Sequence, residues 1–121
     1  EGLFTREFYG NCYKALKEDG IMVNQHESPF YAEDALACQR AHKRIVESFA
    51  ISKVYQAHIP TYPSGHWLFG FASKKYHPVK DLNAAAWNLL GIHTQYYNTR
   101  LHAGAFALPS YVEGLLKDVE P

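Results

Sequence analysis

The chain has 121 residues, enough for one domain and too few for two, and 47% of them are hydrophobic, which predicts a packed core. Its 12 basic and 12 acidic residues cancel and no basic run stands out, so nucleic acid and an acidic membrane surface are not expected partners. No apolar stretch has the length of a membrane span, no signal peptide is visible, and Cys12 and Cys38 lack CxxC spacing. We therefore expect buried, reduced thiols in a cytoplasmic protein.

The first predicted element is a helix over residues 5–17, because hydrophobic residues recur there at every fourth position. Thr5 is a suitable N-cap for this helix, and Gly20 is placed to end it. Residues 21–25 follow as a short predicted strand. The chain therefore begins with a helix that leads into a strand.

A second helix is predicted to begin at Ser28 and Pro29 and to run to about Ser48. Serine is a common N-cap, and proline is favoured at the first helical position because its missing N–H has no partner there anyway. This signal places the start of the second helix directly after the first strand.

Two further strands are predicted over residues 53–59 and 67–73, which are rich in Val, Tyr, Ile and Phe. Residues 61–65 read Thr-Tyr-Pro-Ser-Gly, which is typical of a turn, so the two strands should form an antiparallel hairpin with a wide loop. Short helices around residues 83–90 and 109–116 complete the expected elements.

This order of elements is typical of the second half of a doubly wound α/β sheet that ends in an antiparallel strand. Three strands make a thin sheet, and we expect the first of them to have a bare edge. The sequence opens at Glu1 without an initiator methionine. We therefore expect a fragment whose missing half was removed by proteolysis or lies on another polypeptide.

Four stretches of the sequence together resemble the polyamine aminopropyltransferases, and spermidine synthases in particular. The most specific of them are the Thr-Tyr-Pro-Ser-Gly turn and the tail from Tyr96-Tyr97-Asn98 to Leu108-Pro109. The four stretches are residues 3–9 with 15–20, residues 25–30, residues 59–65 with Trp67 and 72–74, and residues 96–98 with 101–103 and 106–109.

The resemblance implies a Rossmann-like sheet of the class I methyltransferase type, preceded by a small β domain. It implies transfer of an aminopropyl group from decarboxylated S-adenosylmethionine, a co-substrate, to putrescine, with no metal or other cofactor, in a homodimer or a higher oligomer. The family's catalytic aspartate and its glycine-rich nucleotide loop would precede Glu1. The chain alone is therefore expected to be inactive and to supply mainly the diamine side of the site.

Gln25 and Glu27 are two residues apart at the end of a predicted strand and face the same way if the strand continues that far. Strand ends are where α/β sheets place ligand contacts. In the family, Gln25 matches a residue that contacts the diamine, and Glu27 matches an acid for its distal amine. Without the family match, both are ordinary solvated residues at a strand-to-helix junction.

The resemblance assigns four further binding residues. Tyr62 matches a tyrosine at the diamine site, where its hydroxyl can bond an amine, although a turn tyrosine also serves in surface packing. Pro63 and Trp67 match apolar lining, and core packing is the equal alternative for Trp67. Leu3 matches a residue on the adenine side of the nucleotide pocket, and otherwise it is a helix-flanking hydrophobe.

Two other functions remain open at this level. One is a non-catalytic fragment that binds a polyamine or stabilises a partner chain. The other is an aminopropyltransferase for a different amine, or a methyltransferase. A metal site is not expected, because none of the seven histidines pairs at HxxxH or HxH spacing.

Overall fold

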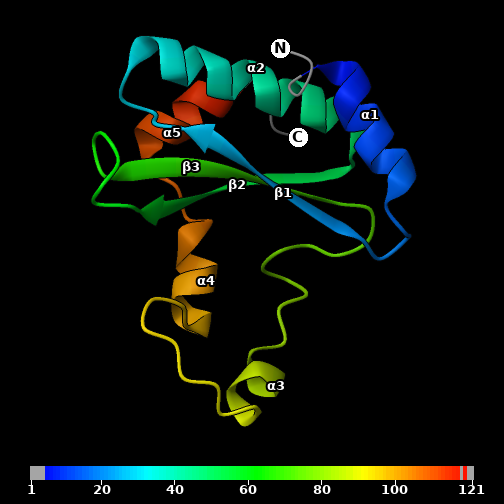
Figure 1. Ribbon diagram of the computed structural model, residues 1–121, viewed down its shortest axis with the longest axis vertical. Helices are drawn as coiled ribbons and strands as arrows, with labels where there is room; N and C mark the ends of the chain where they lie inside the picture. Colours follow the sequence, from blue (N-terminus) through cyan, green and yellow to red (C-terminus); the bar gives the residue numbers. More distant parts are fainter. Residues whose placement is uncertain (1–4, 118, 120–121) are drawn as a thin grey trace.

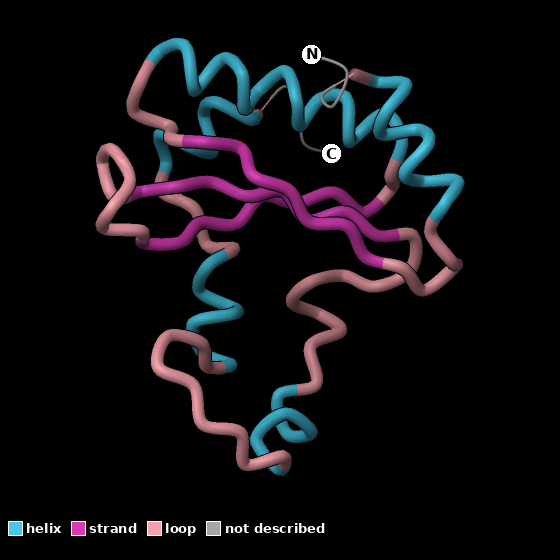
Figure 2. The backbone as a smooth tube through the Cα atoms, viewed as in Figure 1, coloured by secondary structure: helices cyan, strands magenta, loops and turns pink. Residues whose placement is uncertain are grey.

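Three strands form one sheet that has helices on both sides, as Figure 1 shows. The computed structural model describes residues 5–117 and residue 119. The elements are α1 (Arg6–Ala15), β1 (Ile21–Glu27), α2 (Ala32–Ser48), β2 (Ile51–His58), β3 (His66–Ser73), α3 (Ala84–Leu89), α4 (Thr99–Ala105) and α5 (Ser110–Leu116). Helices α1, α2 and α5 lie on one side of the sheet, and α4 lies on the other side with α3 beyond it (Figures 1 and 2).

The sheet has the strand order β1-β3-β2, and both pairings are antiparallel. The predicted hairpin is confirmed, because β2 and β3 pair continuously from Ile51 opposite Ser73 to His58 opposite His66. Strands β1 and β2 therefore run in the same direction with β3 between them. β1 forms an edge of the sheet, as the sequence predicted, and Val23 on it is 58% exposed.

Helix α1 begins as predicted. The Thr5 side chain accepts a hydrogen bond from the backbone N–H of Phe8 at 3.1 Å, which satisfies one of the donors that a helix start leaves open. The helix ends at Ala15, two residues before the predicted end, and the N–H of Leu16 closes it on the carbonyl oxygen of Cys12 at 3.1 Å. The capping geometry thus confirms the predicted start of α1, and the helix ends earlier than predicted.

The predicted start of α2 is wrong. The helix begins at Ala32, and its N-cap is Tyr31, which makes no side-chain capping bond. The Ser28 hydroxyl is instead fully buried, accepts from the N–H of Phe30 at 3.2 Å and lies 2.9 Å from the hydroxyl of Ser64. Because this hydroxyl closes a local turn and joins it to the β2–β3 loop, residues 28–31 form a connection before the helix.

The core lies between the sheet and helices α1, α2 and α5. We call this side of the sheet the closed face; Val54, Leu68 and Ala72 belong to it and are 0–1% exposed. One cluster there comprises Cys38, Val54, Leu68, Val112 and Leu116, and a second comprises Tyr9, Ile45, Phe49 and Ala72. Both cysteines are free thiols; Cys38 is buried as predicted, whereas Cys12 is partly exposed. The other side, with Val23, Tyr55 and Phe71, we call the open face.

The C-terminal third holds α3 and α5 close to their predicted positions, together with one helix that the sequence analysis missed. This helix, α4, is capped by Asn98, whose side chain accepts from the N–H of Leu101 at 2.7 Å. An asparagine cap three residues before a leucine is a recognisable start signal, although the helix has only 7 residues. In the described residues, no helix is both long and apolar enough to span a membrane.

Candidate functional site

The loop between β2 and β3 consists of two successive tight turns that present Tyr62. The backbone N–H of Tyr62 donates to the carbonyl oxygen of Ile59, and the N–H of Gly65 donates to the carbonyl oxygen of Tyr62, each at 3.0 Å. In the second turn, Pro63 has the φ that its ring fixes, and Ser64, the next residue, has a φ of 69°. Proline followed by a positive φ is the pattern of a type II turn. The predicted turn is confirmed, and it holds Tyr62 at the end of the sheet.

Tyr62 packs against Trp67 at the start of β3. Their ring centroids are 4.7 Å apart with an edge-to-face angle of 66°. Trp67 is 8% exposed whereas Tyr62 is 39% exposed. The Trp67 Nε1–H is buried and has no hydrogen-bond partner within the described part of the chain. The pair therefore forms an aromatic wall with a buried base and a rim open to solvent.

Gln25 lies on the same side of the sheet as this wall. It pairs with Phe69 of β3, and directly opposed residues of antiparallel strands point to the same face. Trp67 is two residues from Phe69 and shares that face. Gln25 and Trp67 thus share one sheet face near the C-terminal end of β1, with Tyr62 packed on Trp67, and this is the edge where α/β sheets place ligands.

The other predicted binding residues are less well defined. Pro63 is exposed in the turn. Glu27 is the last residue of β1, but its side chain lies outside the described residues, as does all of Leu3. Gln25 and Glu27 were expected to face the same way because side chains two residues apart in a regular strand do so. The pairing register shifts between these two residues, so the strand is not regular there. That common orientation remains a prediction.

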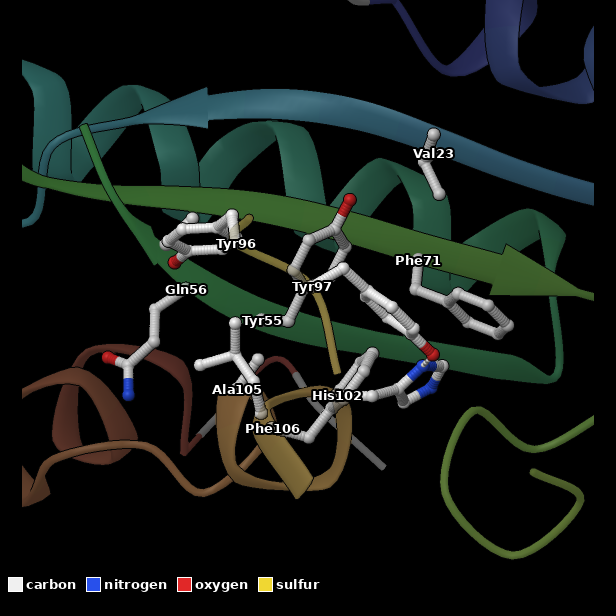
Figure 3. A pocket seen from close by; sticks show the side chains of 11 residues that line it. Val23, Tyr55, Gln56, Phe71, Tyr96, Tyr97, His102, Ala105 and Phe106 are labelled. Carbon is white, nitrogen blue, oxygen red and sulfur yellow. Dashed lines mark hydrogen bonds between the residues drawn. The ribbon is translucent and has the colours of Figure 1, made fainter. Parts of the chain in front are cut away.

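A cavity of about 340 Å³ lies on the open face, between the sheet and α4 (Figure 3), and none of the predicted binding residues that the structure describes lines it. Aromatic and aliphatic side chains form most of its wall, and none of the lining residues is acidic. The lining consists of Val23, Tyr55, Gln56, Ala57, Phe71, Tyr96, Tyr97, Leu101, His102, Ala105 and Phe106. The sequence analysis did not identify this cavity, although Tyr55 in one strand and Phe69 and Phe71 in the next already indicated a second apolar sheet face.

His102 fixes α4 at the rim of the cavity. Its Nε2 lies 2.8 Å from the carbonyl oxygen of Pro78, which can only accept, so Nε2 carries the proton. Its Nδ1 then accepts from the Tyr97 hydroxyl at 2.8 Å, the bond drawn in Figure 3. His102 therefore serves as a local hydrogen-bonding residue that joins α4 to the segment after β3.

A second hydrogen-bonded histidine, His66, joins the start of β3 to α5. Its Nε2 donates to the Gln56 side-chain oxygen at 2.7 Å, and its Nδ1 accepts from the Tyr111 hydroxyl at 3.0 Å. Burial, and to a lesser degree the nearby His58, lowers the pKa of His66. Sequence reasoning missed this network because its members are far apart in the chain.

The open face offers two separate features, an apolar aromatic cavity and the polar groups of Gln25 and Tyr62 beside Trp67. Aromatic walls suit methylene groups, and the Gln25 amide and Tyr62 hydroxyl can accept hydrogen bonds from an amine. Within the described residues, no group of three or more His, Cys, Asp or Glu side chains is placed to hold a metal ion. The arrangement therefore supports binding and alignment of a ligand.

The chain is similar to solved structures of spermidine synthases. As a mixed α/β unit with a three-stranded antiparallel sheet, it superposes on part of the crystal structure of spermidine synthase from Thermotoga maritima, with a TM-score of 0.89 and 42% identity over 95% of this chain and 39% of that one. It also matches a spermidine synthase in complex with the transition-state analogue AdoDATO, with a TM-score of 0.90 and 41% identity over 97% of this chain and 40% of that one.

Residues 1–83 match the spermine/spermidine synthase domain, and the chain belongs to this family. It is 73% identical over 120 residues to a polyamine aminopropyltransferase of Alkaliphilus oremlandii and 72% identical over 116 residues to one of Clostridium beijerinckii. These alignments cover 99% and 96% of this chain but only 42% and 41% of the relatives. The chain thus spans about two-fifths of the length of these relatives.

Proposed function

We propose that this chain is part of a spermidine synthase, which transfers an aminopropyl group from decarboxylated S-adenosylmethionine to putrescine and releases spermidine and methylthioadenosine. The observation that supports the proposal is that Gln25 and Trp67 share one sheet face near the end of β1 and that Tyr62 packs on Trp67. Identity of about 70% to polyamine aminopropyltransferases supports it.

In the proposed reaction, the putrescine nitrogen attacks the propyl carbon bound to the sulfonium sulfur, the carbon–sulfur bond breaks, and the amine loses a proton. An alkylamine has a pKa near that of lysine, about 10.4, so its free form is scarce at pH 7. Restoring the lone pair costs roughly 4–5 kcal/mol, which a positioned carboxylate must help to offset. We assign that base, the catalytic aspartate, to the remainder of the protein.

This chain would then mainly orient the diamine. Gln25 and Glu27 would accept hydrogen bonds from its amines, and the Tyr62 hydroxyl would provide a further acceptor beside the aromatic wall. Pro63 and Trp67 would line the methylene chain, and Leu3 would line the adenine side of the nucleotide pocket. Fixing a flexible dication in one orientation removes much of the entropic part of the barrier.

The proposal includes the assembly of the whole protein. The remaining three-fifths would complete a Rossmann-like sheet along the β1 edge and add a small β domain, the nucleotide loop and the catalytic aspartate. The expected protein is cytoplasmic and a homodimer or a higher oligomer. The exposed side chains of Ile21 and Val23 on β1 and the apolar cavity beside it support an added layer there.

The test is an assay of the full-length protein with decarboxylated S-adenosylmethionine and, separately, putrescine, cadaverine and agmatine, with products identified by mass spectrometry. We expect spermidine and methylthioadenosine from putrescine, and no turnover by the 121-residue chain alone. Preference for another amine would move the protein to a different substrate within the family. Binding of a diamine by the full-length protein without any transfer would contradict the proposal and favour a non-catalytic polyamine-binding protein.

A further inference from the structure

His26 is the extra residue of a β-bulge in β1. Gln25 pairs with Phe69 and Glu27 pairs with Leu68, so β1 advances by two residues where β3 advances by one. In an unbroken register, residue 27 would oppose Trp67 instead. Bulges of this kind bend a strand locally and change where the following residues point, and they are frequent beside active sites.

The His26 imidazole is almost completely enclosed on the α2 side of the sheet. It is 2% exposed, and its ring meets that of His42 edge to face at a centroid distance of 5.4 Å. Burial, and then the proximity of His42, lowers the pKa of His26 to about 3. The ring is therefore neutral at physiological pH, and one of its nitrogens is an acceptor.

Asn24 identifies which nitrogen accepts. Its side-chain nitrogen lies 3.2 Å from His26 Nδ1, and an amide nitrogen can only donate. Nδ1 is consequently the acceptor, and the ring proton is on Nε2. The bond joins residues on either side of Gln25, so it holds the backbone of β1 in its bulged form on the face opposite to the Gln25 side chain.

Gly70 supplies the space for this pair. A Cβ atom at Gly70 would lie 2.3 Å from Asn24 Oδ1 and 2.6 Å from His26 Nε2, well inside contact distance. Asn24 and Gly70 are directly paired across the two strands. The pair Asn24 and His26 therefore requires glycine at position 70. An ordinary apolar core contact would require neither the glycine nor the two polar side chains.

We propose that His26 is a positioning residue for the amine-binding end of β1, where its imidazole, bonded to Asn24 and seated over Gly70, holds the bulge that sets the placement of Gln25 and Glu27. This inference rests on the proposed function, because Gln25 and Glu27 matter only if they bind the amine. His26 itself lies on the opposite face of the strand from Gln25 and acts through the backbone.

The test compares two substitutions in the full-length protein. His26→Leu keeps an apolar volume but removes the acceptor, and His26→Asn keeps an acceptor near the position of Nδ1. We expect His26→Leu to raise the KM for putrescine between about tenfold and a hundredfold, as small misplacements of binding groups do. The KM for decarboxylated S-adenosylmethionine should stay within about twofold, and His26→Asn should restore most of the putrescine KM.

Two controls separate positioning from simple loss of stability. Ile45→Ala weakens the second core cluster, which contains Ile45 but not His26, and should lower the Tm without changing either KM. Asn24→Ala removes the donor to His26 Nδ1 and tests the same bond if His26→Leu does not fold; its putrescine KM should also rise.

An unchanged putrescine KM in His26→Leu or Asn24→Ala, with a lowered Tm, would overturn the inference and leave His26 as a packing residue. Equal rises in both KM values would overturn it as well. A wild-type protein without aminopropyl transfer would instead count against the proposed function, so the two failures are distinguishable.

Discussion

On the closed face, Leu68 is 0% exposed beneath the helices, whereas on the open face Val23 is 58% exposed beside a cavity of about 340 Å³. The closed face is a finished core within this chain, formed by α1, α2 and α5 against the sheet. The open face carries comparable apolar side chains, but among the described helices only α4 lies against it, and Phe106 packs there on Tyr55 and Phe71. Cores of folded domains are close-packed, so the exposed apolar face supports the proposal that the remainder of the protein covers it.

The largest expected difference between the faces is in stability. Leu68→Ala should lower the free energy of unfolding of the full-length protein by about 2–5 kcal/mol, because it leaves a cavity in a packed core. Val23→Ala should lower it by less, about 0.5–2 kcal/mol, because in the proposed full-length protein Val23 is covered by groups from outside this chain. Denaturant and thermal unfolding measure both. No effect of Val23→Ala would instead mean that the open face stays solvated in the full-length protein.

The next effect is the response of the closed face to acid. The pKa of His26 is about 3 in the folded state and about 6.5 in the unfolded chain, so between these values the unfolded state binds more protons. Stability from this group is therefore complete above pH 6.5 and falls as the pH is lowered. Between pH 6.5 and 4.5 the loss should be about 2 kcal/mol.

His26→Asn, which cannot titrate in this range, provides the matched control for the acid response. The titratable neighbour that faces His26 is His42 on α2, and it is retained in the variant. Subtracting the two unfolding curves over pH 4.5–6.5 isolates the contribution of His26. Parallel curves for the two proteins would show that His26 does not cause the acid sensitivity.

On the open face, Tyr62→Phe should affect binding more than folding. The ring contact with Trp67 is retained while the exposed hydroxyl is lost. A hydrogen bond to a charged amine contributes about 1.5–3 kcal/mol, so we expect the putrescine KM to rise by roughly tenfold or more, with little change in Tm. Steady-state kinetics with each substrate varied in turn measures this. A lowered Tm with an unchanged KM would assign Tyr62 to packing alone.

The two faces also differ in how well the sequence predicts them. The closed face follows from local signals. Hydrophobic residues at every fourth position predicted α1, and two segments of β-favouring residues on either side of the Thr-Tyr-Pro-Ser-Gly turn predicted the hairpin. The start of α2 was missed because Ser28 bonds to Ser64, which is 36 residues away. A helix cap predicted from neighbouring residues alone does not take into account a hydrogen-bond partner that is so distant in the chain.

The open face depends on contacts that local signals do not encode. Gln25, Tyr62 and Trp67 were identified from a family resemblance, and the structure adds that Gln25 and Trp67 share a sheet face and that Tyr62 packs on Trp67. The cavity needs Tyr55 and Phe71 from the strands together with Phe106, the residue that follows α4, and no local pattern joins these residues. The bulge at His26 was also beyond sequence reasoning, since a register shift is a property of two strands together.

The smallest predicted effect tests how far the closed face extends. Thr5 caps α1, the first described helix, and its side chain accepts from the N–H of Phe8. Thr5→Ala should lower stability by about 1 kcal/mol, because that donor loses its partner, and Thr5→Ser should restore it. Hydrogen exchange of the α1 amides is the suitable measurement, since fraying at one helix end can escape a global melt.

If α1 is an integral part of the closed face, Thr5→Ala should accelerate exchange throughout the helix, because Tyr9 packs with Ile45 and Phe49 of the core. Faster exchange limited to the first turn would mean that packing by Tyr9 outweighs the cap. Unchanged exchange at every α1 amide would contradict the capping role of Thr5. In that case the closed face would be maintained by burial alone, and the difference between the two faces would be one of apolar contact rather than of local sequence signals.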